Sequence, residues 1–118
     1  FSGSLPVRFR VRTSPAGGGA ITLQVSGDFT PAGGPTAASG ALRYTCSGAS
    51  LGAPCQGVQT AAPGLQTPVL AVPSSACTGG DCGGTDPNTI QLNFTLENDP
   101  GYAAGSYSAQ IIFVISAT

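Results

Sequence analysis

The sequence predicts an all-β fold, an antiparallel β-sandwich, on three observations. Apolar and polar residues alternate with a period of two in several runs, which is the pattern of half-buried strands. The 18 glycines and 10 prolines fall mostly between these runs, as expected for turns that connect short strands. No stretch combines the 3.6-residue apolar spacing of a helix with capping residues, so we expect little helix.

The first predicted strand covers residues 4–13 ("SLPVRFRVRT"). Three arginines alternate with its apolar residues, which are Leu5, Val7, Phe9 and Val11. Pro6 lacks a backbone N–H, so we expect full pairing to begin near Val7. The Gly-rich residues 14–20 have the composition of a flexible linker, and we assign residues 21–118 to the sandwich domain.

Four clear strands are predicted within the domain, at residues 21–29, 41–46, 89–97 and 105–118. Their apolar faces carry Ile21, Leu23 and Val25; Leu42, Tyr44 and Cys46; Ile90, Leu92, Phe94 and Leu96; and Ile111, Phe113 and Ile115. The stretch 57–75 contains three prolines, which confine strands to sheet edges or short pieces. Residues 98–101 ("NDPG") predict a turn. About seven short strands between such turns favour a sandwich of the immunoglobulin-like type.

The four cysteines form two local pairs along the chain, Cys46 with Cys55 and Cys77 with Cys82. Three connectivities exist, and we favour the local one because short Gly-rich loops close readily. Disulfides indicate an oxidising compartment outside the cytosol. A zinc site is the weaker interpretation, because the chain has neither a Cys-x-x-Cys pair nor a histidine.

Composition argues against several classes of function. The net charge is −1, whereas proteins that bind nucleic acid or an anionic membrane surface usually carry a positively charged surface. No apolar run reaches the length of a membrane span. With no histidine or lysine, acid–base chemistry would depend on five scattered carboxylates, so we expect no enzyme, cofactor or metal site. Acidic residues in the loops, Asp81, Asp86, Glu97 and Asp99, favour turn chemistry over calcium binding. We expect a processed, mature chain because the first residue is Phe1.

The layout resembles that of chaperone-usher pilins, in particular the archaic branch with spore-coat-U-like domains, or of a related filament subunit that exchanges strands. The resemblance rests on "SLPVRFRVRT" as a donor strand, "ITLQVSGDF" as the first body strand and "GSYSAQIIFVISAT" as the terminal strand beside a groove. It implies an incomplete sandwich whose groove accepts the donor strand of the next subunit. The expected acceptor residues are Ile21, Leu23, Val25, Ile111, Phe113 and Ile115.

The resemblance therefore implies a secreted subunit of a cell-surface filament with roles in adhesion or biofilm. Identical subunits would join head to tail, and a periplasmic chaperone and an outer-membrane usher are the further partners it implies. The arm holds three of the four arginines and no acidic residue. This charge either steers the arm toward an acidic neighbour or keeps an exposed strand soluble.

A second interpretation keeps residues 1–13 within their own domain, because the linker is long enough for the strand to fold back. The chain is then a monomeric secreted module that binds a carbohydrate or surface ligand. Tyr102, in the turn-rich stretch after residue 97, is the aromatic residue expected to be exposed for such binding.

Overall fold

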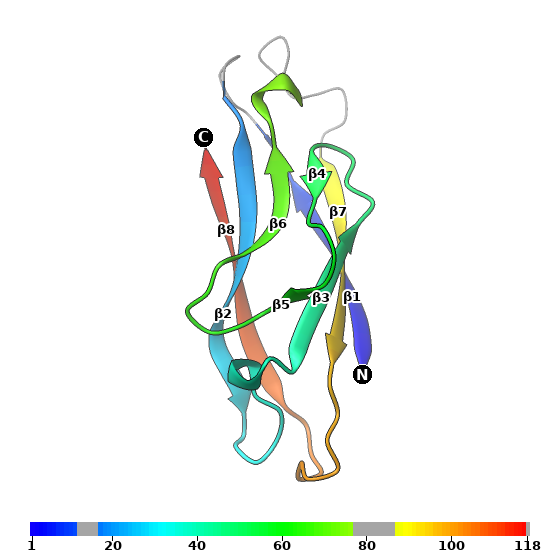
Figure 1. The fold of residues 1–118 in the computed structure, drawn as a ribbon, viewed down its shortest axis with the longest axis vertical. Helices are drawn as coiled ribbons and strands as arrows, with labels where there is room; N and C mark the ends of the chain where they lie inside the picture. The colour runs from blue at the N-terminus through cyan, green and yellow to red at the C-terminus, as the bar shows by residue number, and fades with distance from the viewer. Residues whose placement is uncertain (12–16, 77–86, 118) are drawn as a thin grey trace.

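The computed structural model describes residues 1–11, 17–76 and 87–117, and shows two four-stranded antiparallel sheets packed as a sandwich (Figure 1). Sheet A has the order β1-β7-β3-β5, with bounds Ser2–Phe9, Asn88–Leu96, Leu42–Ser47 and Gln59–Thr60. Sheet B has the order β4-β6-β2-β8, with bounds Ala53–Pro54, Thr67–Val72, Gly19–Thr30 and Ser108–Ala117. Within the described residues, two 3-10 turns are the only helical segments, η1 (Ala37–Ser39) and η2 (Ser74–Ala76). The predicted antiparallel sandwich is confirmed.

The core lies between the inner faces of the two sheets, where the alternating apolar residues meet. The largest fully buried side chains are Tyr44, Leu23, Ile90, Leu92, Val25 and Val69. They come from β2, β3, β6 and β7, the interior strands of the two sheets. Burial of one such side chain contributes about 1.5–3 kcal/mol, so these four strands supply most of the packing free energy.

The proline-rich middle of the chain differs from the prediction. Strand β6 lies inside sheet B, between β4 and β2, although Pro68 is its second residue. The β2–β6 register shifts between Ile21, opposite Leu70, and Thr22, opposite Pro68. The residue that this shift leaves without a partner on β2 is Val69, as in a β-bulge, whereas Pro68 keeps its place opposite Thr22.

Strand β1 belongs to sheet A in the structure of the single chain, paired along its length with β7. Pairing begins at Ser2 and continues through Pro6, so the expectation that it begins near Val7 is wrong for this chain. An edge strand directs alternate N–H groups away from its neighbour, which is why a proline is tolerated within it. Donation of β1 to a second subunit concerns two chains and stays a prediction.

The sandwich has two distinct ends. At one end, called the linker end, β1, β6 and β8 end and β2 begins. Residues from these four strands line one groove there. At the opposite loop end, residues 31–36 contact residues 97–107, for example through the Ala103 N–H, which donates to Gly33 O at 2.9 Å. Of the two long edge strands, β1 borders sheet A and β8 borders sheet B on the same side of the sandwich (Figure 1).

Candidate strand-exchange interface

The β1–β7 ladder is the contact through which a strand exchange would operate. Its register runs from Ser2 opposite Thr95 to Phe9 opposite Asn88 without a shift. Ile90 and Leu92 of β7, which lie opposite Val7 and Leu5, are both fully buried. The sequence predicted β7 as a strand without identifying it as the partner of β1, and the acceptor predicted on β2 and β8 concerns a second chain and stays a prediction. Alternation within a strand identifies its two faces, whereas the neighbouring strand is chosen by the packing of the whole sandwich.

The four proposed anchor residues, three in β1 and Val11 just after it, differ in burial. Phe9 is 7% exposed, Val7 and Val11 are half-buried against the core, and Leu5 is 37% exposed. Side-chain burial is therefore greatest at the linker end of the strand and least near its first residues. Because the outward-facing residues Ser4, Pro6 and Arg8 are exposed, burial of β1 depends mainly on Phe9 and Val7.

The six predicted acceptor residues come together on paired strands of sheet B. Ile21, Leu23 and Val25 of β2 lie opposite Ile115, Phe113 and Ile111 of β8, respectively. The β2 residues are buried, Ile111 and Phe113 are half-buried, and Ile115 is 74% exposed. The β8 half of this surface is thus incompletely covered by sheet A.

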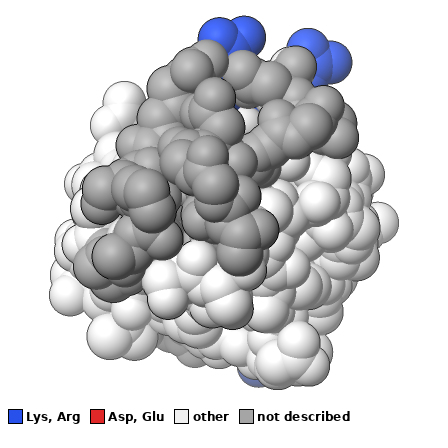
Figure 2. All heavy atoms as spheres, turned by 90° about the horizontal axis from the view of Figure 1, so that it is seen from above, with Lys and Arg blue, Asp and Glu red and all other residues white. Residues whose placement is uncertain are grey.

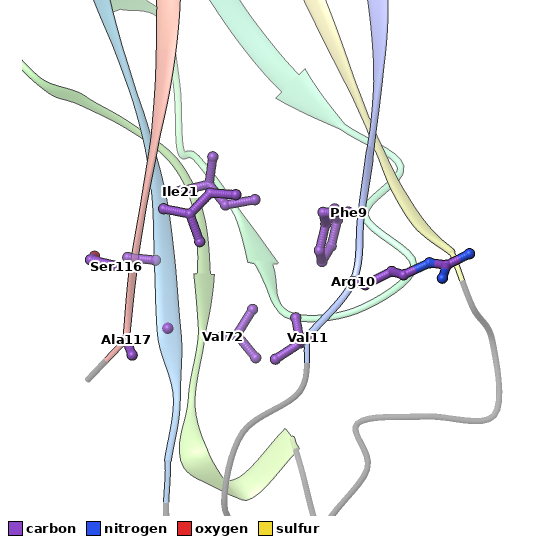
Figure 3. Close-up of a pocket in the computed structure, with 10 residues that line it drawn as sticks. Phe9, Arg10, Val11, Ile21, Val72, Ser116 and Ala117 are labelled. Atoms are coloured by element: carbon purple, nitrogen blue, oxygen red, sulfur yellow. The ribbon is translucent and has the colours of Figure 1, made fainter.

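A groove of about 180 Å³ separates β1 from sheet B at the linker end (Figure 3). Phe9 of β1 and Val11, two residues after it, line it on one side, and Ile21, Val72 and Ile115 line it from sheet B. Arg10 extends away from this apolar space in Figure 3. Two of the proposed anchors, Phe9 and Val11, and two of the proposed acceptor residues, Ile21 and Ile115, therefore line one groove.

Charge is unevenly placed on the described residues. Figure 2 shows arginine side chains at the rim of the linker end and no acidic side chain on the visible surface of the described residues. At the loop end, Arg43 Nη2 lies 3.9 Å from Glu97 Oε2. Both side chains of this pair are more than half exposed, so it contributes little to stability. Arg12, Asp81 and Asp86 lie outside the described residues.

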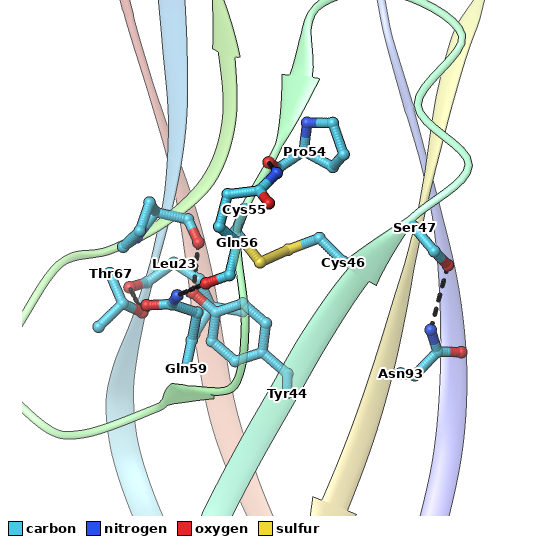
Figure 4. The surroundings of a disulfide bond; sticks show 11 residues. Leu23, Tyr44, Cys46, Ser47, Pro54, Cys55, Gln56, Gln59, Thr67 and Asn93 are labelled. Carbon is cyan, nitrogen blue, oxygen red and sulfur yellow. Dashed lines mark hydrogen bonds between the residues drawn. A yellow bond between two sulfur atoms is a disulfide. The ribbon is translucent and has the colours of Figure 1, made fainter.

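The disulfide Cys46–Cys55 joins the end region of β3 in sheet A to the residue after β4 in sheet B (Figure 4). Its S–S distance is 2.03 Å and its Cα atoms are 5.3 Å apart. This confirms the predicted local pairing for the first two cysteines, and it ties the sheets together on the side opposite β1 and β8. Cys77 and Cys82 lie outside the described residues, so their pairing stays a prediction.

Tyr44 provides a second connection between the sheets beside this disulfide (Figure 4). Its hydroxyl lies 2.7 Å from Thr67 Oγ1 and donates to Pro68 O at 2.7 Å, while Thr67 Oγ1 donates to Leu23 O at 3.2 Å. Burial raises the pKa of Tyr44, an effect partly offset by the hydrogen bond with Thr67. The phenol therefore stays neutral and able to donate throughout the physiological range.

Asp28 organises the loop end through hydrogen bonds from its neighbours. Its carboxylate accepts from Thr36 Oγ1 and from the backbone N–H groups of Phe29 and Ala37. Partial burial acts to raise the pKa of Asp28, but these hydrogen bonds outweigh it and hold the pKa below its ordinary value. The carboxylate has a structural role because its contacts are to its own loop.

A second groove lies at the loop end, where Tyr102 and Tyr107 line it together with Glu97 and Asn98. Tyr107 is fixed, since its hydroxyl donates to Ala103 O at 2.6 Å and its ring lies against Gly34, where a Cβ would come within 2.2 Å of it. Tyr102 is half-buried, so it presents less aromatic surface than the monomeric-module interpretation expects. The turn predicted at residues 98–101 forms one residue later, where the Tyr102 N–H donates to Asp99 O at 3.0 Å and Asp99 Oδ1 accepts from the Gly101 N–H at 2.7 Å.

The described residues contain neither a cluster of metal ligands nor a membrane-spanning helix. No group of three or more His, Cys, Asp or Glu side chains among them is placed to hold a metal ion. No helix in the same residues has the length and apolar character needed to cross a membrane.

Comparison of the chain with models of protein families, with curated proteins and with solved structures finds no significant match. The all-β sandwich therefore rests on the structure alone, and the resemblance to pilins rests on the order and patterning of the strands.

Proposed function

We propose that this chain is a structural subunit of an extracellular filament and that β1 of each subunit pairs with β7 of the next. The observation that supports the proposal is the β1–β7 ladder, which is a complete and separable docking contact. It is eight residue pairs long, unshifted and formed by an edge strand that a Gly-rich linker joins to the rest of the chain. A strand of this kind can leave its own sheet and occupy the same place in another copy, with every contact conserved.

Removal of β1 without replacement is unfavourable, so an exchanged joint would be durable. Loss of Phe9 burial costs about 1.5–3 kcal/mol, and β7 would become an unpaired edge. In the closed form β1 pairs with β7 of its own chain, and in the exchanged form it pairs with β7 of a neighbour. Both forms contain the same ladder, so the equilibrium between them depends on subunit concentration and on the linker. The Cys46–Cys55 disulfide supports secretion, the setting in which a filament of this kind, delivered by a chaperone and an usher, would assemble.

The linker limits how neighbouring subunits can be arranged. Phe9 and Gly19 both lie at the linker end, and the nine residues between them span at most about 35 Å. The sandwich is 54 Å long. Consecutive subunits would therefore overlap or tilt strongly, since stacking end to end in one orientation exceeds the reach of the linker.

A cysteine pair across the ladder tests the proposal. Ser2 and Thr95 lie opposite each other and are both exposed, and cross-strand pairs have Cα separations that a disulfide can bridge. After oxidation, the double variant Ser2→Cys/Thr95→Cys is expected to form a covalent ladder of multimers on a non-reducing gel, because each bond joins two subunits.

Each single variant, Ser2→Cys or Thr95→Cys, is the matched control and should form no ladder. If the double variant yields only an internally bonded monomer, β1 stays in its own sheet and the filament proposal is wrong. A covalent dimer without larger species would equally contradict it, since a reciprocal exchange closes on itself.

The second candidate function is a monomeric secreted binding module, and the pairing of β1 with β7 in the single chain favours it. In that case the internally bonded monomer is the expected product of the same experiment. The groove beside Tyr102 and Tyr107 is then the surface at which a ligand would bind.

A further inference from the structure

The outer edge of β8 is unpaired in the described part of the chain and has none of the usual protection of a sheet edge. The strand contains ten residues, no charge and no proline. Its ladder with β2 is regular from Ile111 to Ala117, so this part of the edge is not disrupted by a bulge. Ile115 is 74% exposed and Ile112 is 44% exposed, on opposite faces of the strand. Long, uncharged apolar edges of this kind favour pairing with another strand.

The other edges of the two sheets lack these properties. Strand β1 carries Pro6 and Arg8, and β4 and β5 are two residues long. Among the described strands, therefore, the one free edge that matches β8 in length and apolar character is β8 of a second copy. The absence of charge also removes the repulsion that usually prevents a strand from pairing with itself.

We propose that two copies of this chain associate through antiparallel pairing of their β8 strands about a two-fold axis at Phe113. In this register the odd-numbered residues of one β8 lie opposite the odd-numbered residues of the other. The core-facing residues of both copies therefore stay on the same face of the joined sheet. It places Ile111 beside Ile115, Ile112 beside Val114 and Gln110 beside Ser116, so apolar residues meet apolar residues and polar meet polar. Shifting the axis to Ile112 would put Gln110 beside Val114 and Ala109 beside Ile115.

The contact is isologous and joins two four-stranded sheets into one continuous sheet. It rests on β8 alone and leaves the β1–β7 ladder intact. In a filament it would act between neighbouring filaments and pair them laterally, with each weak contact multiplied along the length.

A lysine in the edge tests the contact. Ile112→Lys places a charge on an exposed position of β8 and is expected to raise the dimer dissociation constant about tenfold or more in sedimentation velocity, because each copy adds a charge to an apolar pair. Val58→Lys is the matched control, since Val58 is 65% exposed in the segment between β4 and β5. It should leave the dissociation constant unchanged. Equal weakening by both variants, or a wild-type chain that stays monomeric at every concentration, would overturn the proposal.

The register is tested by mixing two single variants, Ile112→Cys and Val114→Cys. Disulfide formation in the mixture is expected to be several times faster than in either variant alone, because Ile112 of one copy lies opposite Val114 of the other. Faster cross-linking of Ile112→Cys with itself would overturn the axis at Phe113. The Ser2→Cys/Thr95→Cys variant tests strand exchange independently of β8. Failure of the β8 contact is therefore distinguished from failure of the filament proposal.

Discussion

At the scale of single residues, Tyr44 shows how one polar group links two apolar layers. It projects from β3 of sheet A, and its hydroxyl contacts Thr67 and Pro68 of sheet B within the core. Tyr44→Phe keeps the ring, including its contact with Phe94 at 5.7 Å between centroids, but leaves buried polar atoms with fewer partners. We expect the free energy of unfolding, measured in urea, to fall by about 1–3 kcal/mol.

Tyr107→Phe is the control for this substitution. Its loss of unfolding free energy should be smaller because water reaches that more exposed site. A loss no larger than that of the control would show that the Tyr44 hydroxyl contributes little.

Asp28 makes a pH-dependent contribution at the same scale. Its pKa is lowered in the folded chain, so its contribution is present above the ordinary carboxyl pKa of about 4 and is lost as the pH falls through the folded value. Asp28→Asn should lower the free energy of unfolding near pH 7 by about 1 kcal/mol, since the loop is partly exposed, and the difference from wild type should shrink in acid. Unfolding curves at pH 7 and in acid measure this. Glu97→Gln removes the same charge from an exposed surface pair and should show a smaller difference. A difference that grows in acid would contradict the assignment.

At the scale of elements, alternation predicted β2, β3, β7 and β8 because each has one apolar face that the sandwich buries. Strands in the stretch 57–75 were expected at sheet edges or as short pieces because of its three prolines; β5 is such a strand, whereas β6 is an interior strand of six residues. The β6 ladder with β2 contains a register shift at Val69, which is a property of two strands together. The acceptor predicted on β2 and β8 concerns a joint between two chains and stays a prediction. Alternation alone does not show which strand pairs with β1, which in the single chain is β7. The exposure of Ile115 was also hidden, because a residue on an inward-facing position is buried only where the other sheet extends over it.

At the scale of the whole molecule, the linker determines whether β1 returns to its own sheet. Deleting residues 12–17 leaves Arg10, Val11 and Gly18 between Phe9 and Gly19, a span of at most about 14 Å. Packed sheets lie about 10 Å apart, so the shortened chain has little length left to turn from sheet A into sheet B. The closed form is disfavoured, whereas a neighbouring sheet still offers an acceptor for β1. We therefore expect size-exclusion chromatography with light scattering to show fewer monomers and more oligomers, increasingly so at higher concentration.

A chain in which a Gly-Ser segment of equal length replaces residues 12–17 is the matched control for this deletion. It keeps the reach of the linker and should resemble wild type. Circular dichroism of both variants shows whether the sheets still form, since β2 to β8 contain most of the core and remain unchanged. A deletion variant that is folded and monomeric at all concentrations would show that β1 either detaches or closes without a neighbour. Either result would exclude exchange as the source of assembly, because in neither case does β1 pair with β7 of a neighbouring subunit.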